Sequence, residues 1–197
     1  MISAVVLAAG CSSRMGKDKL LVPLNSGTVL GHTINNVLIS EIDEVFVVLG
    51  HRASEKEKYV KNNFEDLKTV INEDYHQGLS SSVRKGLDAV NSDCQAVIFC
   101  PGDLPLVSPA VVRGLIQLFQ EQQCPVVYPE YMGIRGNPVL FSKEVFPLFE
   151  NLSGDEGGRS IIIHSGKRAC ILKTDCEGVL RDIDTPEDLL KIRSKMK

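Results

Sequence analysis

Short apolar runs alternate along the chain with longer segments whose apolar residues have helical spacing. Short β-branched runs predict buried strands, and apolar residues three or four positions apart predict helices that cover a sheet. Strands are predicted at 2–7, 45–50, 67–71, 96–100 and 125–128, and helices at 29–39, 54–64, 79–90 and 109–119. This rhythm predicts a three-layer, Rossmann-like α/β fold, with a mostly parallel central sheet and helices on both faces.

Beyond residue 131 the alternation is less regular. The sequence predicts strands at 139–141, 169–172 and 178–181, a short helix at 145–149, and a helix or tight turn at 160–164. A closing helix is predicted at 185–195, with Asp184 or Thr185 as its N-terminal cap. Because the chain has no internal repeat, low-complexity segment or linker, we expect one domain spanning residues 1–197.

The most informative stretch is 5–19, which begins as a strand and passes into small residues, two glycines and three cations. Small residues let the main chain approach a ligand closely and turn its N–H groups toward anionic oxygens. The small residues here are Ala8, Ala9, Gly10, Ser12 and Ser13. Arg14 and Lys19 add full charges, so the stretch predicts a polyphosphate site; an ordinary glycine-rich turn is the alternative.

Spacing excludes two better-known phosphate motifs. A P-loop has four residues between its first glycine and a Gly-Lys pair, which Ser or Thr follows. In this chain five residues separate Gly10 from Gly16, and an aspartate follows the Gly-Lys pair. The dinucleotide-binding fingerprint needs glycines at two positions that Ser12 and Met15 occupy here.

Two acidic elements that follow predicted strands are candidates for a metal site. Asp103 comes after the strand at 96–100, between a glycine and prolines. Mg²⁺ is usually held by one or two carboxylates plus substrate phosphates. The alternative for Asp103, capping the next helix, is disfavoured because Ser108 is nearer. Asp182 and Asp184 alternate along an extended segment and point the same way, so one ion can contact either or both; Asp184 is preferred, with helix capping as its alternative.

The segment 72–82 begins at the end of the third predicted strand and is rich in hydrogen-bonding groups. Gln77, the amides around Gly78, and the hydroxyls of Ser80 and Ser81 supply both donors and acceptors, as recognition of a base edge requires. A plain helix cap by Ser80 or Ser81 is the alternative. His76 is expected to be a surface or structural residue.

Composition limits the partners. The net charge of −3 and the pI of about 5.8 give no overall electrostatic footprint for nucleic acid or an anionic membrane. No apolar run approaches the length of a spanning helix, and the six cysteines form neither a C-x-x-C pair nor a zinc-finger pattern. We therefore expect a cytoplasmic protein with reduced cysteines, no membrane contact and no nucleic-acid partner.

The first loop, Leu7-Ala8-Ala9-Gly10-x-Ser12-x-Arg14-Met15-Gly16-x-x-Lys19, resembles the signature of nucleotidyltransferases of the glycosyltransferase-A-like fold, and in particular of their molybdenum cofactor group. Later motifs extend the resemblance over essentially the whole chain: Gln-Gly-Leu-Ser, Pro-Gly-Asp-Leu-Pro, Gly-x-x-Gly-Asn-Pro, Gly-Asp-x-Gly-x-Arg and Asp-Ile-Asp-Thr-Pro-Glu-Asp. The resemblance implies a nucleotide-diphospho-sugar transferase-like fold. Residues 1–130 are then the nucleotide-binding half, and residues 131–197 the acceptor-site and closing half.

The resemblance also assigns roles to residues. It implies catalytic roles for Arg14, Lys19 and Asp103, and Mg²⁺ ligation by Asp103 and Asp184. The implied nucleotide contacts are Leu7, Ala8, Ala9, Gly10, Ser12, Gln77, Gly78, Ser80 and Ser81. The glycine-dense loops 133–138 and 152–159 then face the second substrate through Gly136, Asn137 and Arg159, with Arg135 as a further phosphate contact; ordinary loops are the alternative.

The implied reaction is transfer of CMP from CTP to molybdenum cofactor (molybdopterin), with release of pyrophosphate. CTP is favoured over GTP because Ala9 stands where the guanylyl-transferring branch usually has glycine. The alternatives are a transferase that uses GTP, one that acts on a sugar or polyol phosphate, and a non-catalytic accessory protein in the maturation of a molybdenum hydroxylase. A molybdenum hydroxylase or its chaperone is a further possible partner.

Overall fold

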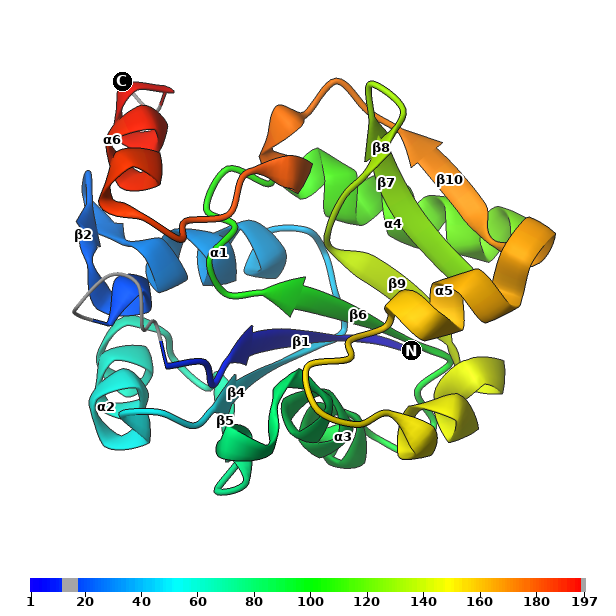
Figure 1. The fold of residues 1–197 in the computed structure, drawn as a ribbon, viewed down its shortest axis with the longest axis horizontal. Helices are drawn as coiled ribbons and strands as arrows, with labels where there is room; N and C mark the ends of the chain where they lie inside the picture. Colours follow the sequence, from blue (N-terminus) through cyan, green and yellow to red (C-terminus); the bar gives the residue numbers. More distant parts are fainter. Residues whose placement is uncertain (12–17, 196–197) are drawn as a thin grey trace.

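The computed structural model describes residues 1–11 and 18–195, and its core is one mixed sheet between two layers of helices (Figure 1). The strands run in the order β10-β7-β9-β6-β1-β4-β5. Their bounds are β1 Ile2–Ala8, β4 Glu44–Leu49, β5 Lys68–Ile71, β6 Ala96–Pro101, β7 Val126–Tyr131, β9 Val139–Ser142 and β10 Cys170–Lys173. These strands pair in parallel except for β9, which runs antiparallel to β6 and β7, and the short β8 (Ile134–Arg135) joins the sheet antiparallel to β7. The predicted fold class is confirmed.

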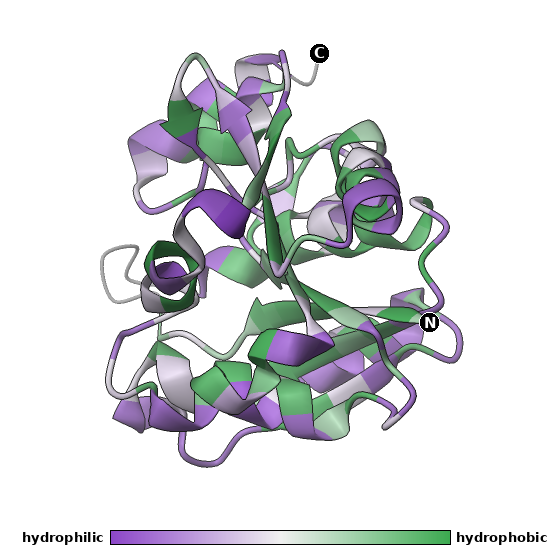
Figure 2. Cartoon of the chain, turned by 90° about the vertical axis from the view of Figure 1, so that its right-hand side faces the viewer, coloured by the Kyte–Doolittle hydropathy of each residue, from purple (hydrophilic) through white to green (hydrophobic). Residues whose placement is uncertain are grey.

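Two separate hydrophobic clusters fill the space on the two faces of the sheet. Helices α1 (Val29–Leu38), α2 (Ala53–Asn63), α4 (Pro109–Gln122) and α6 (Pro186–Lys195) contribute to one cluster. Helices α3 (Leu79–Ala89) and α5 (Arg159–Ser165) contribute to the other, together with the 3-10 segment η4 (Lys143–Asn151). Figure 2 shows the central strands in hydrophobic colours between helices with hydrophilic outer faces.

Alternation along the central strands explains why they are apolar throughout. In β1, Ala4, Val6 and Ala8 face one cluster while Val5 faces the other. A strand in the middle of a parallel sheet is buried on both sides, so every position favours an apolar residue. Short elements complete the chain: β2 (Pro23–Leu24), β3 (Gly27–Thr28), β8 (Ile134–Arg135), η2 (Lys19–Leu21), η3 (Tyr75–Gln77), η5 (Gly166–Arg168) and η6 (Glu177–Leu180).

Two expectations are wrong. The segment 178–181, expected to be a strand, lies mostly in the 3-10 helix η6, where Gly178 packs directly against the backbone carbonyl of Leu106 and leaves no room for a side chain. The cysteines are not all reduced: Cys124, after α4, and Cys170, at the start of β10, are joined by a disulfide. Their separation of 46 positions hides this pairing in the sequence.

None of the helices in the described part of the chain is both long and apolar enough to cross a membrane.

Candidate functional site

A cavity of about 830 Å³ lies at the carboxyl ends of β1 and β6. Segments that are distant in the sequence line it together, which is the usual ligand position in open α/β sheets. The predicted site residues in its wall are Leu7, Ala9, Gly10, Lys19, Gly78, Asp103, Gly136, Asn137 and Arg159. Ala8, Gln77, Ser80, Ser81 and Asp184 do not line it. The predicted contacts Ser12 and Arg14 lie outside the described residues.

The end of β1 turns its small residues in two directions. Ala8 is fully buried on one face of the sheet, whereas Ala9 packs on the other and reaches the cavity wall. A Cβ added at Gly10 would meet no atom within 4 Å among the described residues, and Gly10 lines the cavity.

Three carboxylates converge at one end of the site. Asp103, Asp182 and Asp184 each offer an oxygen, and these oxygens lie within 4.8 Å of one another. Lys19 places its ammonium in this cluster: Nζ donates to Asp103 Oδ2 at 2.6 Å and to Asp184 Oδ1 at 2.7 Å. Lys19 is therefore positioned at the carboxylates by direct contact with two of them.

The charges of this cluster shift each other's protonation. Burial opposes the charge of Lys19, but the attraction and hydrogen bonds of Asp103, followed by those of Asp184, outweigh it and raise the lysine pKa. Burial, followed by repulsion from Asp103 and Asp184, raises the pKa of Asp182. Carboxylates held this close repel one another, so the cluster is stabilised when one of them is protonated or when a cation binds between them.

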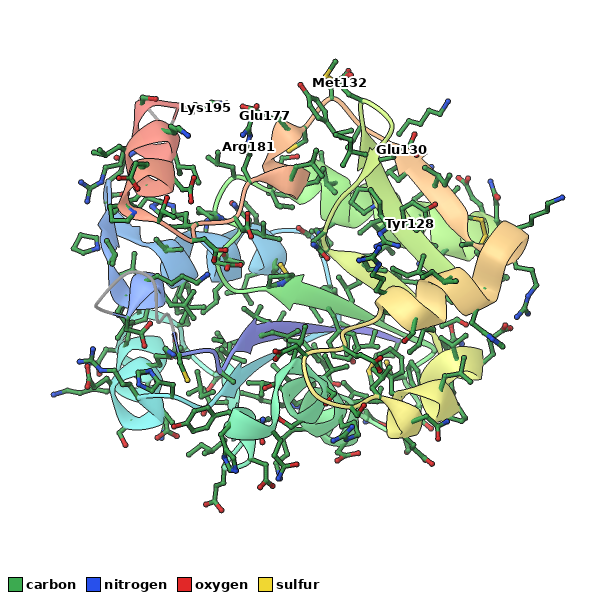
Figure 3. All side chains as sticks on the ribbon, in the orientation of Figure 1. Tyr128, Glu130, Met132, Glu177, Arg181 and Lys195 are labelled. Carbon is green, nitrogen blue, oxygen red and sulfur yellow. A yellow bond between two sulfur atoms is a disulfide. The ribbon has the colours of Figure 1, made fainter. Side chains whose placement is uncertain are left out.

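The segment that carries Asp182 and Asp184 is fixed at several points. The Ile183 N–H donates to the Asp103 carbonyl at 3.3 Å, which joins the two acidic elements directly. Before the segment, Glu177 pairs with Arg181 at 3.3 Å and also with Lys195 near the end of α6; Figure 3 shows these three side chains together. The two carboxylates thus sit on a segment tied to both η6 and α6.

A reciprocal cap begins α6 immediately after Asp184. Asp188 Oδ2 accepts from the Thr185 N–H at 2.9 Å and the Thr185 hydroxyl at 2.8 Å, and the Asp188 N–H donates back to Thr185 Oγ1 at 3.2 Å. This is a capping box with Asp in the third helical position. The sequence offered Asp184 and Thr185 as candidates for the N-terminal cap, and Thr185 is the residue that provides it.

Sequence reasoning missed Ser82 in the segment after β5. Asn72 is buried and donates through Nδ2 to Ser81 Oγ at 2.9 Å and to Ser82 Oγ at 3.0 Å. Ser81 also donates to the Gly78 carbonyl at 2.8 Å. Ser82, one helical position further, lines the cavity. The exposed Gln77 instead donates to Asp74 at 2.9 Å.

Gly78 is required by both its conformation and its neighbours. Its φ of 101° lies in the region that favours glycine, and an added Cβ would lie 2.3 Å from the Gly154 carbonyl carbon. The Ser80 N–H also donates to the Gly154 carbonyl at 3.0 Å. These contacts bring the glycine-dense loop 152–159 against the start of α3, beside the cavity.

The second glycine-dense loop forms the opposite wall. Gly136 packs against Val179, and the Asn137 N–H donates to the Val179 carbonyl at 2.9 Å. Arg135 and Arg159 line the cavity from the two loops, and neither forms an ion pair with another described residue. Two exposed guanidinium groups with this placement suit an anionic ligand.

Comparison with known proteins agrees with this geometry. The MobA-like NTP transferase domain matches residues 4–169. The chain belongs to this family. It is 29% identical over 195 residues to the molybdenum cofactor cytidylyltransferase of Escherichia coli (strain K12), which covers 98% of this chain and 96% of that protein. It is 31% identical over 204 residues to the probable molybdenum cofactor guanylyltransferase of Natranaerobius thermophilus, with 98% and 95% covered.

Solved structures support the same family assignment for this MobA-like chain. The structure of Rv0371c from Mycobacterium tuberculosis H37Rv in complex with manganese has a TM-score of 0.82 and 29% identity, and the match covers 98% of each chain. A nucleotidyl transferase from Methanothermobacter has a TM-score of 0.85 at 29% identity, with 99% of this chain and 97% of that chain covered. The protein is thus a nucleotidyltransferase of the MobA-like family.

The acidic cluster of this MobA-like transferase fits a divalent metal ion. Hard cations such as Mg²⁺ and Mn²⁺ prefer carboxylate oxygens, and Asp103, Asp182 and Asp184 supply three within a short distance. The Lys19 ammonium, which already contacts two of them, shows that the cluster accommodates positive charge. Asp182 is a third candidate ligand, in addition to the predicted Asp103 and Asp184. Its position two residues before Asp184 is the feature of the sequence that indicates it.

Proposed function

We propose that this protein transfers CMP from CTP to molybdenum cofactor in a Mg²⁺-dependent reaction that releases pyrophosphate. The observation that carries the proposal is the meeting of three carboxylates and Lys19 at a cavity that Arg135 and Arg159 also line. The manganese complex of Rv0371c supports a divalent ion in this fold. The relatives named as molybdenum cofactor nucleotidyltransferases support the acceptor.

The chain's own residues mainly bind and orient the two substrates. An acceptor phosphate oxygen forms a bond to the α-phosphorus of CTP, and the bond from that phosphorus to the oxygen bridging to the β-phosphate breaks, with the electron pair leaving on pyrophosphate. Asp103, Asp182 and Asp184 would hold the Mg²⁺, which neutralises negative charge on the phosphate oxygens when bound. Lys19 and Arg14 add fixed positive charge. Such positioning and charge stabilisation need no protein nucleophile.

Ala9 supports CTP over GTP. Its buried methyl group lies at the cavity wall and packs closely against Gly50, where an added Cβ would lie 2.8 Å from it. A methyl group in place of hydrogen narrows the site, which favours a pyrimidine over a larger purine. Gly78 and the hydroxyl of Ser82 lie in the adjacent wall, where base-edge groups can be recognised. Ser80 and Ser81, the predicted base contacts, would then act by supporting this turn.

The acceptor is assigned to the side of the cavity formed by Gly136, Asn137 and Arg159. Arg135, next to Gly136, also lines the cavity, and its charge and that of Arg159 are suited to a phosphate group. A sugar or polyol phosphate offers the same anionic group.

The test is pyrophosphate release from CTP, GTP and ATP with Mg²⁺, with and without molybdenum cofactor, and with Asp103→Asn as the blank. The proposal predicts release with CTP only when the cofactor is present. Pyrophosphate release with GTP but not with CTP would overturn the assignment of the base. Release with a sugar or polyol phosphate in place of the cofactor would overturn the assignment of the acceptor. CTP binding without release for any acceptor would favour an accessory protein.

A further inference from the structure

Lys56 is a buried charge that the proposed reaction does not use. It lies on α2 with 0% of its side chain exposed. Its ammonium donates to the Ala8 carbonyl at 3.0 Å and to the His51 carbonyl at 2.8 Å, and it forms an ion pair with Asp18 Oδ2 at 2.9 Å. The three contacts come from the end of β1, from the turn after β4, and from the residue immediately before Lys19.

Asp18 continues this set of contacts toward the acidic cluster. It is 5% exposed, and its Oδ1 accepts from the Leu20 N–H at 3.1 Å, which caps η2. Lys19 is the first residue of η2, and its side chain contacts Asp103 and Asp184. The backbone that carries Lys19 is therefore fixed by a carboxylate whose own charge is neutralised by Lys56.

Stability alone does not explain a lysine at this position. Replacing a buried ion pair with well-packed apolar residues is often neutral or stabilising, and Val60, one turn further along α2, shows that this face accepts an apolar side chain. Burial lowers the pKa of Lys56, while Asp18 opposes the shift. The specific consequence of the lysine is that it joins the two ends of the 8–18 segment.

We infer that Lys56 is a positioning residue of the nucleotide site: through its contacts with the Ala8 carbonyl and the Asp18 carboxylate it holds Lys19 in place beside the acidic cluster. The inference rests on the proposed function, in which Lys19 takes part. It does not require Lys56 to touch a substrate. Since Lys56 acts through Lys19, its contribution should disappear when the Lys19 ammonium is absent.

The experiment is a double-mutant cycle of Lys56→Met and Lys19→Met, followed by pyrophosphate release. Lys56→Met should lower kcat about tenfold in the native background but less than about twofold in the Lys19→Met background, as expected for coupled neighbours. Equal fold losses in both backgrounds would overturn the inference, because general damage to folding acts alike on both. Lys61→Met is the matched control, since Lys61 lies on the same helix, is exposed and pairs only with Glu57 among the described residues.

Amide hydrogen exchange gives a second readout that does not depend on activity. Exchange at the Leu20 N–H should be faster in Lys56→Met than in Lys61→Met, while exchange in α4 stays unchanged. Unchanged exchange at Leu20 would overturn the inference. If Lys56→Met does not fold, Asp18→Asn, which keeps an oxygen for Leu20, replaces it in both measurements with the same expected pattern. If the native protein releases no pyrophosphate, the proposed function fails while the exchange result still decides the positioning role.

Discussion

Lys19 and the carboxylates around it determine the electrostatics of the site at the scale of single residues. The ammonium contacts Asp103 and Asp184, and Asp182 completes the cluster with an oxygen within 4.8 Å of theirs. A metal ion and the ammonium carry charge of the same sign, so they compete for the same oxygens. The resting contacts of Lys19 therefore oppose metal binding even though its charge assists the reaction.

Lys19→Met is expected to separate these two effects. It should lower kcat by roughly 10² to 10³, the usual loss for one preorganised electrostatic contact, while tightening Mn²⁺ binding in the absence of nucleotide. Electron paramagnetic resonance of free Mn²⁺ measures the second effect. Lys173→Met, on the exposed side of β10, is the control. Weaker Mn²⁺ binding in Lys19→Met would show that the lysine does not compete with the ion.

Gly78 offers a second test with single residues. Gly78→Ala combines a strained φ of 101° with a clash against Gly154, so we expect the KM for the nucleotide to rise about tenfold as the loop is displaced. Gly166→Ala is the matched control, because Gly166 also has positive φ but no described atom within 4 Å of the added Cβ. Equal effects of the two substitutions on KM would assign the loss to backbone strain alone.

Among the elements, α6 does more than close the fold, because its capping box fixes the residues next to Asp184. Hydrogen bonds from Thr185, first its hydroxyl, hold the pKa of Asp188 below its ordinary value. A carboxyl with a lowered folded-state pKa stabilises the fold above the unfolded-state pKa of about 3.9 and loses that contribution as the pH falls through the folded-state value. Acid should therefore weaken this cap.

Thr185→Ala is expected to lower the free energy of unfolding by about 1 kcal/mol at pH 7, the usual cost of losing a side-chain cap. Asp188→Asn should destabilise in the same direction at pH 7, and its difference from the native protein should shrink below about pH 4. Urea unfolding at both pH values measures this. A difference that is constant with pH would show that the ionised carboxylate contributes nothing to the cap.

The strands show which elements can be predicted from sequence patterns and which cannot. The strands β1, β4 and β6 were predictable because burial on both faces requires continuous apolar runs. The segment at 178–181 also begins with apolar residues, but it lies mostly in the 3-10 helix η6, where Gly178 contacts the Leu106 carbonyl of a distant loop. Local patterns carry no information on such a contact. The two-residue strands β2, β3 and β8 are likewise too short for any period to be detected.

At the scale of the whole molecule, both halves of the chain contribute strands to one sheet. Strand β9, from beyond residue 131, lies between β6 and β7, so the two halves pair directly. This arrangement brings the cavity wall at Asn137 opposite the loops after β1 and β5. The sequence predicted the individual motifs, but not that Lys19 would bridge Asp103 and Asp184 or that Lys56 would pair with Asp18, since both depend on side chains converging from distant segments.

A ligand that contacts several of these segments should stabilise the whole fold. CTP with Mg²⁺ at about 100 times the dissociation constant should add roughly 2.7 kcal/mol to the free energy of unfolding. Urea unfolding with and without the pair measures this gain. The gain should be much smaller in Asp103→Asn but retained in Asp175→Asn, a control at an exposed aspartate outside the cavity. An equal gain in Asp103→Asn would place the ligand elsewhere.

The most direct test measures whether the acidic cluster and the nucleotide phosphates bind the same divalent ion. Mn²⁺ bound to the protein with CTP carrying ¹⁷O on the α-phosphate would be observed by electron paramagnetic resonance. We expect ¹⁷O broadening in the native protein and loss of the bound Mn²⁺ signal when Asp103, Asp182 and Asp184 are replaced together by Asn. Mn²⁺ and CTP bound with no ¹⁷O broadening, or bound equally by the triple variant, would contradict it.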